Sequence, residues 1–208
     1  MQLLSPLKKS ARWLSPTLVV LGAAFFSALS VADHEGGKHS YALVPDESAI
    51  RFISVKNAAI AEVHHFKTLR GGVDSGKVEI RVPLVDVETM IPIRNERMQK
   101  MLFETDLYPR AVLSSQLDMA PIMALANGDS LEMNVDISLD LHGVTQSLQA
   151  PVRVARLGKE IHVTTDTPLI LNVADFNLAE GVERLKTVAA LNNISTAVPV
   201  MAHLVFSR

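Results

Sequence analysis

The sequence contains no cysteine and a single tryptophan, and each scarcity excludes a class of protein. Without cysteine there is no disulfide bond, iron–sulfur cluster, thiol nucleophile, cysteine zinc site or lipid anchor on a cysteine. Aromatic residues make up 5% of the 208 residues, which is too few for the stacking surface that single-stranded nucleic acid requires. Stability must therefore come from an ordinary hydrophobic core.

The N-terminus holds a basic cluster followed by an apolar run. Three basic residues within positions 8–12 precede apolar residues 18–29, and small residues lead up to Ala32. This order is typical of a secretory signal peptide, and the run is short for a membrane span of roughly 20 residues. We expect cleavage after Ala32, a flexible lead over 33–40, one domain over 41–208, a periplasmic location and no stable membrane insertion. The alternative is an uncleaved anchor.

Removal of that segment leaves an acidic chain. It takes three of the 20 basic residues and none of the 22 acidic ones. An excess of negative charge disfavours phosphate binding, so no nucleic-acid partner is expected. Hydrophobic residues at 48% and charged residues at 20% exclude a disordered chain and indicate a folded domain.

Apolar and polar residues alternate along much of the chain. From Leu131 to Leu141 every odd position is apolar and every even position is polar. That period of two is typical of a half-buried strand. Short turns between such segments predict antiparallel neighbours. We expect strands over 41–44, 50–55, 67–74, 78–84, 111–119, 131–141, 148–154, 160–165, 169–173 and 196–206.

Two segments depart from this period and predict short helices. Met98, Met101 and Leu102 stand at helical spacing within 95–103, and a similar spacing spans 182–189. The expected fold class is all-β, a closed antiparallel barrel of about eight strands with one or two short helices. Such a barrel is just wide enough to be filled by side chains or to hold one small ligand. Its inward stripes are aliphatic, and alternation alone fits a solid core and a lined cavity equally well.

Neither a catalytic nor a metal site is predicted. Residues 71–78 spell G-x-x-x-x-G-K, but Val78 lacks the hydroxyl of a phosphate-binding loop and a strand pattern follows, which favours a hairpin. His64 and His65 have no third ligand at a metal-site spacing, and we expect them on the surface or in a loop. No nucleophile and base pair appears, so we expect no enzyme, no cofactor and no metal.

Several short segments, in this order and spacing, resemble the YceI-like family. They are Tyr41–Ser48 with Ile50–Phe52, Arg94–Met98, Phe103-Glu104 with Tyr108–Ala111, Leu141–Gln146 and Asp175-Phe176. Asn95 stands where the family usually has aspartate. The family comprises exported bacterial proteins that bind lipid or polyisoprenoid in a lipocalin-like barrel. The resemblance implies that this chain binds or carries a long apolar lipid, an isoprenoid or an acyl chain, in the periplasm without converting it.

The residues expected to line the ligand cavity lie on inward stripes or at these family landmarks. They are Phe52, Leu113, Val135, Ile137, Leu139, Val152 and Phe176. The resemblance also makes Arg94 a candidate for holding a headgroup or pinning a helix across the barrel mouth, because guanidinium donors form a rigid fork. The alternative for Arg94 is an ion pair with Glu96 or Asp106.

Two functions stay open at this point. The first is the binding of an apolar lipid. The alternative is a packed barrel that serves as a stress-related structural or interaction domain without a lipid. A continuous apolar cavity above roughly 300 Å³ in the folded protein would distinguish them. The oligomeric state is open, a dimer included.

Overall fold

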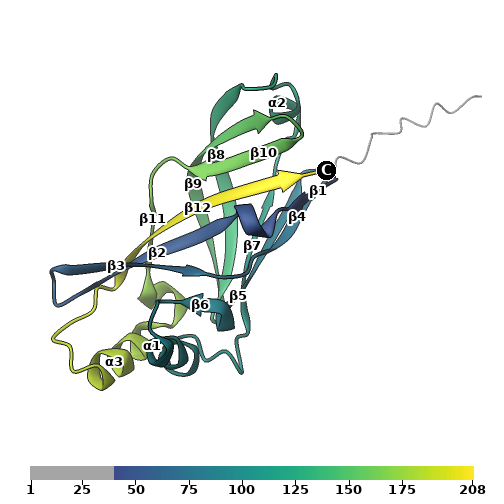
Figure 1. Ribbon diagram of the computed structural model, residues 1–208. Coiled ribbons are helices and arrows are strands. Elements are labelled where there is room, and N and C mark those ends of the chain that lie inside the picture. Colours follow the sequence, from purple (N-terminus) through teal and green to yellow (C-terminus); the bar gives the residue numbers. More distant parts are fainter. Residues whose placement is uncertain (1–39) are drawn as a thin grey trace, which may run out of the picture. The chain divides into compact units, whose positions relative to one another are not determined.

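Antiparallel strands hydrogen-bond in a closed ring, with short helices at both ends (Figure 1). The protein is described by a computed structural model over residues 40–208. The expected signal peptide and residues 33–39 lie outside the described residues. The strands are β1 (Ser40–Leu43), β2 (Ala49–Lys56), β3 (Ile60–Phe66), β4 (Arg70–Asp74), β5 (Lys77–Pro83), β6 (Val87–Glu88), β7 (Arg110–Gln116), β8 (Ser130–Leu141), β9 (Val144–Leu157), β10 (Glu160–Thr165), β11 (Leu169–Asn172) and β12 (Ala197–Ser207).

The helices are short. They are α1 (Pro92–Arg97), α2 (Ala120–Met123) and α3 (Ala179–Val188), with the 3-10 turns η1 (Pro45–Glu47), η2 (Leu84–Asp86) and η4 (Val173–Phe176) and the π turn η3 (Met98–Leu102). Within residues 40–208, no helix is both long and apolar enough to cross a membrane.

The ring runs β1-β4-β5-β7-β8-β9-β10-β12 and closes where β12 pairs with β1. The long strand β12 makes this closure possible because each of its edges serves two partners. One edge pairs with β10 and then β11, and the other pairs with β1 and then β2. Strand β3 adds to β2, and β6 adds to β3. The predicted fold class, an all-β closed antiparallel barrel of eight strands, is confirmed.

The register of β8 and β9 explains which side chains reach the interior. Ile137 stands opposite Leu148 and Val135 opposite Ala150, so two apolar stripes meet on one face. On the other face Glu132 stands opposite Arg153 and forms an ion pair with it. The alternation seen in the sequence therefore sets the inward and outward faces of these strands, as expected.

Tight turns hold neighbouring strands in register. Ser75 and Gly76 join β4 to β5 with φ of 51° and 84°, the conformation of a two-residue hairpin turn. A Cβ at Gly76 would lie 2.3 Å from the carbonyl oxygen of Leu117, so glycine is needed there on two counts. The glycine-rich segment is thus a hairpin, as predicted.

The two ends of the barrel carry different caps. Helices α1 and α3 lie together at one end, and α2 lies at the other (Figure 1). Close packing joins α3 to η3, because a Cβ on Gly181 would lie 2.7 Å from the carbonyl oxygen of Met101. The two predicted helices correspond to α1 with η3 and to α3.

Candidate ligand-binding cavity

Two adjoining cavities lie inside the barrel. Their volumes are about 180 Å³ and about 130 Å³. Five residues line both cavities: Leu113, Ile137, Ala150, Thr165 and Ala202. Each cavity alone is smaller than the continuous volume of roughly 300 Å³ expected of a ligand pocket, and the two volumes together are about equal to it.

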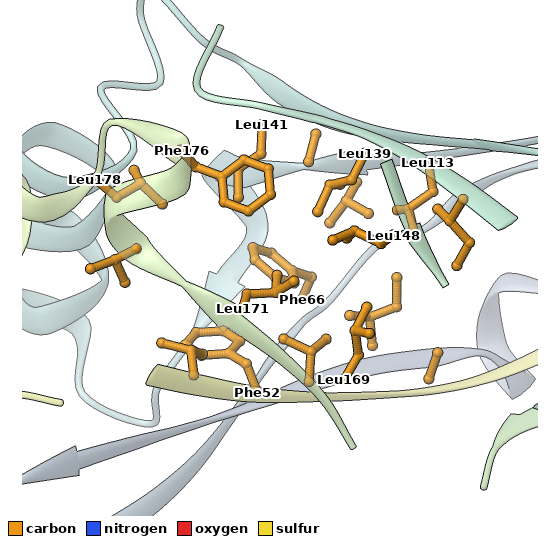
Figure 2. Close-up of a pocket in the computed structure, with 18 of the residues that line it drawn as sticks. Phe52, Phe66, Leu113, Leu139, Leu141, Leu148, Leu169, Leu171, Phe176 and Leu178 are labelled. Carbon is orange, nitrogen blue, oxygen red and sulfur yellow. The ribbon is translucent and has the colours of Figure 1, made fainter. Parts of the chain in front are cut away.

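Hydrocarbon side chains face the larger cavity (Figure 2). Among the described residues, the polar ones that line it are Thr165 and Asn172. Their side-chain oxygens accept hydrogen bonds within the protein, Thr165 Oγ1 from the Ala202 amide at 3.2 Å and Asn172 Oδ1 from the Ala174 amide at 3.1 Å. The rest of this lining is hydrocarbon, so the space suits an apolar chain.

The helical end of the larger cavity is closed by buried side chains. Leu102, Phe103, Phe176 and Leu178 come from η3, η4 and their flanks, and all four line the cavity. Arg184 on α3 strengthens this cap by donating its Nε and Nη2 to the Met101 carbonyl at 3.2 and 2.7 Å. Packed side chains and the hydrogen bonds of Arg184 thus close this end of the barrel.

All seven predicted wall residues line the cavities. Phe52, Leu139 and Phe176 face the larger space, Val135 and Val152 face the smaller, and Leu113 and Ile137 face both. Figure 2 shows Phe52, Leu113, Leu139 and Phe176 approaching the larger space from different sides. Their contact with a ligand stays a prediction.

Arg94 lines neither cavity. Its Nη1 donates to Glu62 Oε2 at 2.8 Å, and its Nη2 donates to the Thr89 carbonyl. The ion pair is therefore formed with Glu62 on β3 and not with Glu96 or Asp106, the two partners suggested by proximity in the sequence. In this position Arg94 fastens α1 to β3.

The neighbouring Asn95 fastens the segment before α1. Its Oδ1 accepts from the Thr89 amide at 2.9 Å and from the Thr89 hydroxyl at 2.6 Å, while its Nδ2 donates to Glu88 Oε1 at 3.0 Å. The Asn95 amide, followed by the Met90 amide and Lys67, lowers the pKa of Glu88 to about 2. Asparagine suits this place because an ionised aspartate could not donate to Glu88.

Comparison with known proteins agrees with this geometry. A family model for the YceI-like domain matches residues 41–206. The chain belongs to the YceI-like family. A solved polyisoprenoid binding domain from Saccharophagus degradans, implicated in plant cell wall breakdown, is 37% identical with a TM-score of 0.79, and the match covers 80% of this chain and 97% of that one.

A second solved structure shares the fold alone. BcnA of Burkholderia cenocepacia is 19% identical with a TM-score of 0.59, and the match covers 77% of this chain and 96% of that one. No curated protein matches this YceI-like sequence.

One histidine of this YceI-like chain is buried, although we expected it on the surface or in a loop. His64 on β3 is 2% exposed and packs against Phe52, with ring centroids 5.2 Å apart. Its Nε2 hydrogen-bonds with Ser54 Oγ at 2.9 Å. Burial, and then the Arg94 charge, lowers the pKa of His64 to about 4, so the ring is neutral at pH 7. Expecting a surface or loop histidine was wrong for His64, because β3 turns this polar side chain inward.

A second buried histidine sits beside the helical cap. His142, in the β8–β9 turn, has its Nε2 3.0 Å from Glu104 Oε2 and its ring 4.3 Å from that of Tyr108. Glu104 also receives Arg184 Nη2 at 3.3 Å. These contacts tie the turn to η3 and α3. Sequence reasoning missed them because Glu104, His142 and Arg184 are far apart along the chain and follow no common period.

Metal-ligating side chains do not gather in the part of the chain that the structure describes. No group of three histidine, aspartate or glutamate side chains among residues 40–208 is placed to hold a metal ion. The candidate site of this YceI-like protein is therefore the apolar interior.

Proposed function

We propose that this protein binds a long apolar chain, an isoprenoid or an acyl chain, inside its barrel and does not convert it chemically. The observation that carries the proposal is the pair of adjoining apolar cavities along the barrel interior. The 37% identical relative supports it, since that protein is a polyisoprenoid binding domain.

Burial of hydrocarbon supplies the affinity. Each methylene group that leaves water contributes about 0.8 kcal/mol without any polar contact. We propose Phe52, Leu113 and Phe176, with Val135, Ile137, Leu139 and Val152, as the residues that a bound chain touches. Their side chains carry no nucleophile, acid or base, which favours binding over catalysis.

The alternative, a packed barrel without a lipid, predicts an interior filled by side chains. The two cavities disfavour it, because well-packed interiors contain few voids larger than a water molecule.

Extraction of the natively purified protein with organic solvent, followed by mass spectrometry, tests the proposal. An apolar chain is expected in the extract of the native protein. Ile137→Trp fills the space shared by both cavities and should reduce the recovered lipid at least fivefold. Ile170→Trp is the matched control, because Ile170 is 58% exposed on β11. An empty extract together with no binding of an added isoprenoid would leave the packed domain as the better reading.

The periplasm is the proposed location. The signal-peptide pattern before Asp33 supports it, although these residues lie outside the described part of the chain. N-terminal sequencing of the native protein should begin at Asp33. Retention of Met1 in a membrane fraction would contradict the proposal.

A further inference from the structure

The ladder between β7 and β8 is much shorter than either strand. Only Val112–Ser114 pair with Ser138–Asp140. Strand β8 has 12 residues and pairs along its whole length with β9. The edge of β8 that faces β7 therefore has no ladder partner over residues 130–137 within the described chain. Here the barrel wall is not joined by backbone hydrogen bonds.

The two strands part because each follows its other neighbour. Beyond Ser114, β7 stays with β5, and the Leu117 amide then donates to the Gly76 carbonyl at 2.8 Å. Over the same stretch β8 stays with β9. A single side chain bridges the separation, since Ser115 Oγ donates to the Asp136 carbonyl at 2.7 Å.

An open groove lies on the outer surface at this place. Its volume is about 430 Å³, and it is lined by Lys77, Ser114, Ser115, Gln116, Asp136, Ile137, Ser138 and Ser147. Ser114 stands opposite Ser138, and Ser138 stands opposite Ser147, so a row of three small side chains crosses three strands and leaves the surface hollow.

The groove and the interior share a wall. Ser114, Ser115 and Ile137 line both the groove and the smaller cavity. Ser115 occupies an inward position of β7, opposite Val78 on β5. The other inward residues of β7, Ala111 and Leu113, are apolar, so Ser115 is a polar exception on this face. Where the strands part, the side chains of Ser114, Ser115 and Ile137 therefore lie between the outer groove and the apolar interior.

Both ends of the barrel offer greater obstruction. The helical end is plugged by buried Phe103 and Phe176 and tied by Arg184 to the Met101 carbonyl. At the other end Ile122 of α2 is 3% exposed and lines the smaller cavity. A ligand passing either end would have to displace a packed helix. Passage between β7 and β8 breaks the hydrogen bond of Ser115 and moves the side chain of Ile137.

We propose that the apolar ligand enters and leaves the barrel sideways, between β7 and the N-terminal half of β8. This inference rests on the proposed function and specifies the route to the same cavity. An obstacle placed in a route slows association and dissociation by the same factor and leaves the equilibrium constant unchanged, whereas a change in the cavity wall alters that constant.

Ser138→Trp places such an obstacle. Ser138 lines the groove and neither inner cavity. With cis-parinaric acid, a slender acyl probe that fluoresces in apolar surroundings, stopped-flow measurements should show both rates at least fivefold slower and Kd within twofold of the parent. Ile170→Trp is the control, because Ile170 is exposed on β11, away from both β7 and β8, and lies outside the groove. Should Ser138→Trp fail to fold, Ser147→Trp, exposed in the same groove, replaces it.

An engineered disulfide bond between β7 and β8, here called the clamp, gives a second measurement because it can be formed and reduced. Ser114 and Ser138 are directly opposed where the strands part, and such partners are about 4.5–5.5 Å apart at Cα, within the range of a disulfide. Since the chain has no cysteine, Ser114→Cys with Ser138→Cys creates a single bridge. Oxidation should slow exchange of the probe and reduction should restore it. Asp140→Cys with Thr145→Cys, opposed on the continuous β8–β9 ladder, is the control.

The outcomes separate the two proposals. If only the tryptophan variant slows exchange of the probe, the ligand passes between β7 and β8 without the strands moving apart. If the oxidised disulfide slows exchange as well, the strands have to move apart for the ligand to pass. Unchanged exchange in a folded tryptophan variant and in the oxidised clamp overturns the lateral route while leaving lipid binding intact. Failure of the parent protein to bind cis-parinaric acid or any added isoprenoid overturns the proposed function and the route with it.

Discussion

Ile137→Asp and Asp136→Asn change adjacent residues of β8 that face opposite sides of the barrel wall. Ile137 lines both cavities, whereas Asp136 is exposed in the outer groove. Full burial of an isoleucine side chain contributes roughly 1.5–3 kcal/mol, and the half-buried Ile137 contributes part of that. A carboxylate at this position adds several kcal/mol, because no positively charged side chain lines either inner cavity to pair with it. We expect Ile137→Asp to lower the free energy of unfolding by at least about 4 kcal/mol at pH 7.

The pH dependence sharpens this prediction. An aspartate forced into the apolar cavity has its folded pKa raised above the unfolded value of about 3.9. The folded state then binds more protons, so the destabilisation grows as pH rises from about 4 and is smaller below it. Asp136→Asn should cost less than about 1 kcal/mol, because the new amide oxygen can still accept from Gln149 Nε2, which lies 3.1 Å from Asp136 Oδ1.

Urea unfolding of both variants and the parent, followed by circular dichroism at pH 4 and pH 7, measures these differences. Equal losses at the two positions would refute the assignment of faces on β8. A loss below about 1 kcal/mol for Ile137→Asp would mean that water already solvates the interior, and the apolar cavity would no longer support lipid binding.

Three further predictions follow from individual contacts. The pKa of His64 is about 4 when folded against 6.5 for the free side chain, so parent stability should fall as pH drops from about 7 to 4 by up to about 3 kcal/mol, and His64→Gln should flatten that profile in urea titrations. Gly181→Ala should cost about 1–3 kcal/mol in thermal unfolding, because its Cβ would lie 2.7 Å from the Met101 carbonyl oxygen. Arg94→Lys should lower stability by about 1 kcal/mol through loss of the two-branched contact, with the affinity for cis-parinaric acid unchanged within twofold. A tenfold loss of affinity there would instead restore Arg94 as a headgroup residue.

Alternation along the sequence predicted the strands whose inward positions are all apolar. Strand β8 is the clearest case, with Met133, Val135 and Ile137 facing the cavities and Leu139 and Leu141 buried. In such a strand, the polarity of each residue predicts whether its side chain faces the interior or the solvent, so the neighbouring strands need not be known.

Strand β3 escaped prediction because its polarity is reversed. Val63 is 58% exposed, whereas His64 is 2% exposed. The reversal depends on tertiary partners, since Ser54 on β2 satisfies one nitrogen of the histidine. A period-two search rests on burial of apolar residues and cannot find a strand whose buried residue is polar. The predicted strand over 111–119 was likewise too long, because β7 ends at Gln116.

Whether the barrel is hollow depends on the alignment of small side chains in three dimensions. Ala150 on β9 and Ala202 on β12 both face the two cavities, so the middle of the barrel lacks the bulk that its ends receive from phenylalanine and methionine. Alanine and leucine are equally apolar in a binary pattern, so alternation predicts the apolar stripes but not the empty space between them. Short side chains at Ala150 and Ala202 leave room in the lining of both cavities, where a larger apolar residue would fill the interior. On the outer surface, the short side chains of Ser114, Ser138 and Ser147 leave the groove hollow at the place where we propose that the ligand passes.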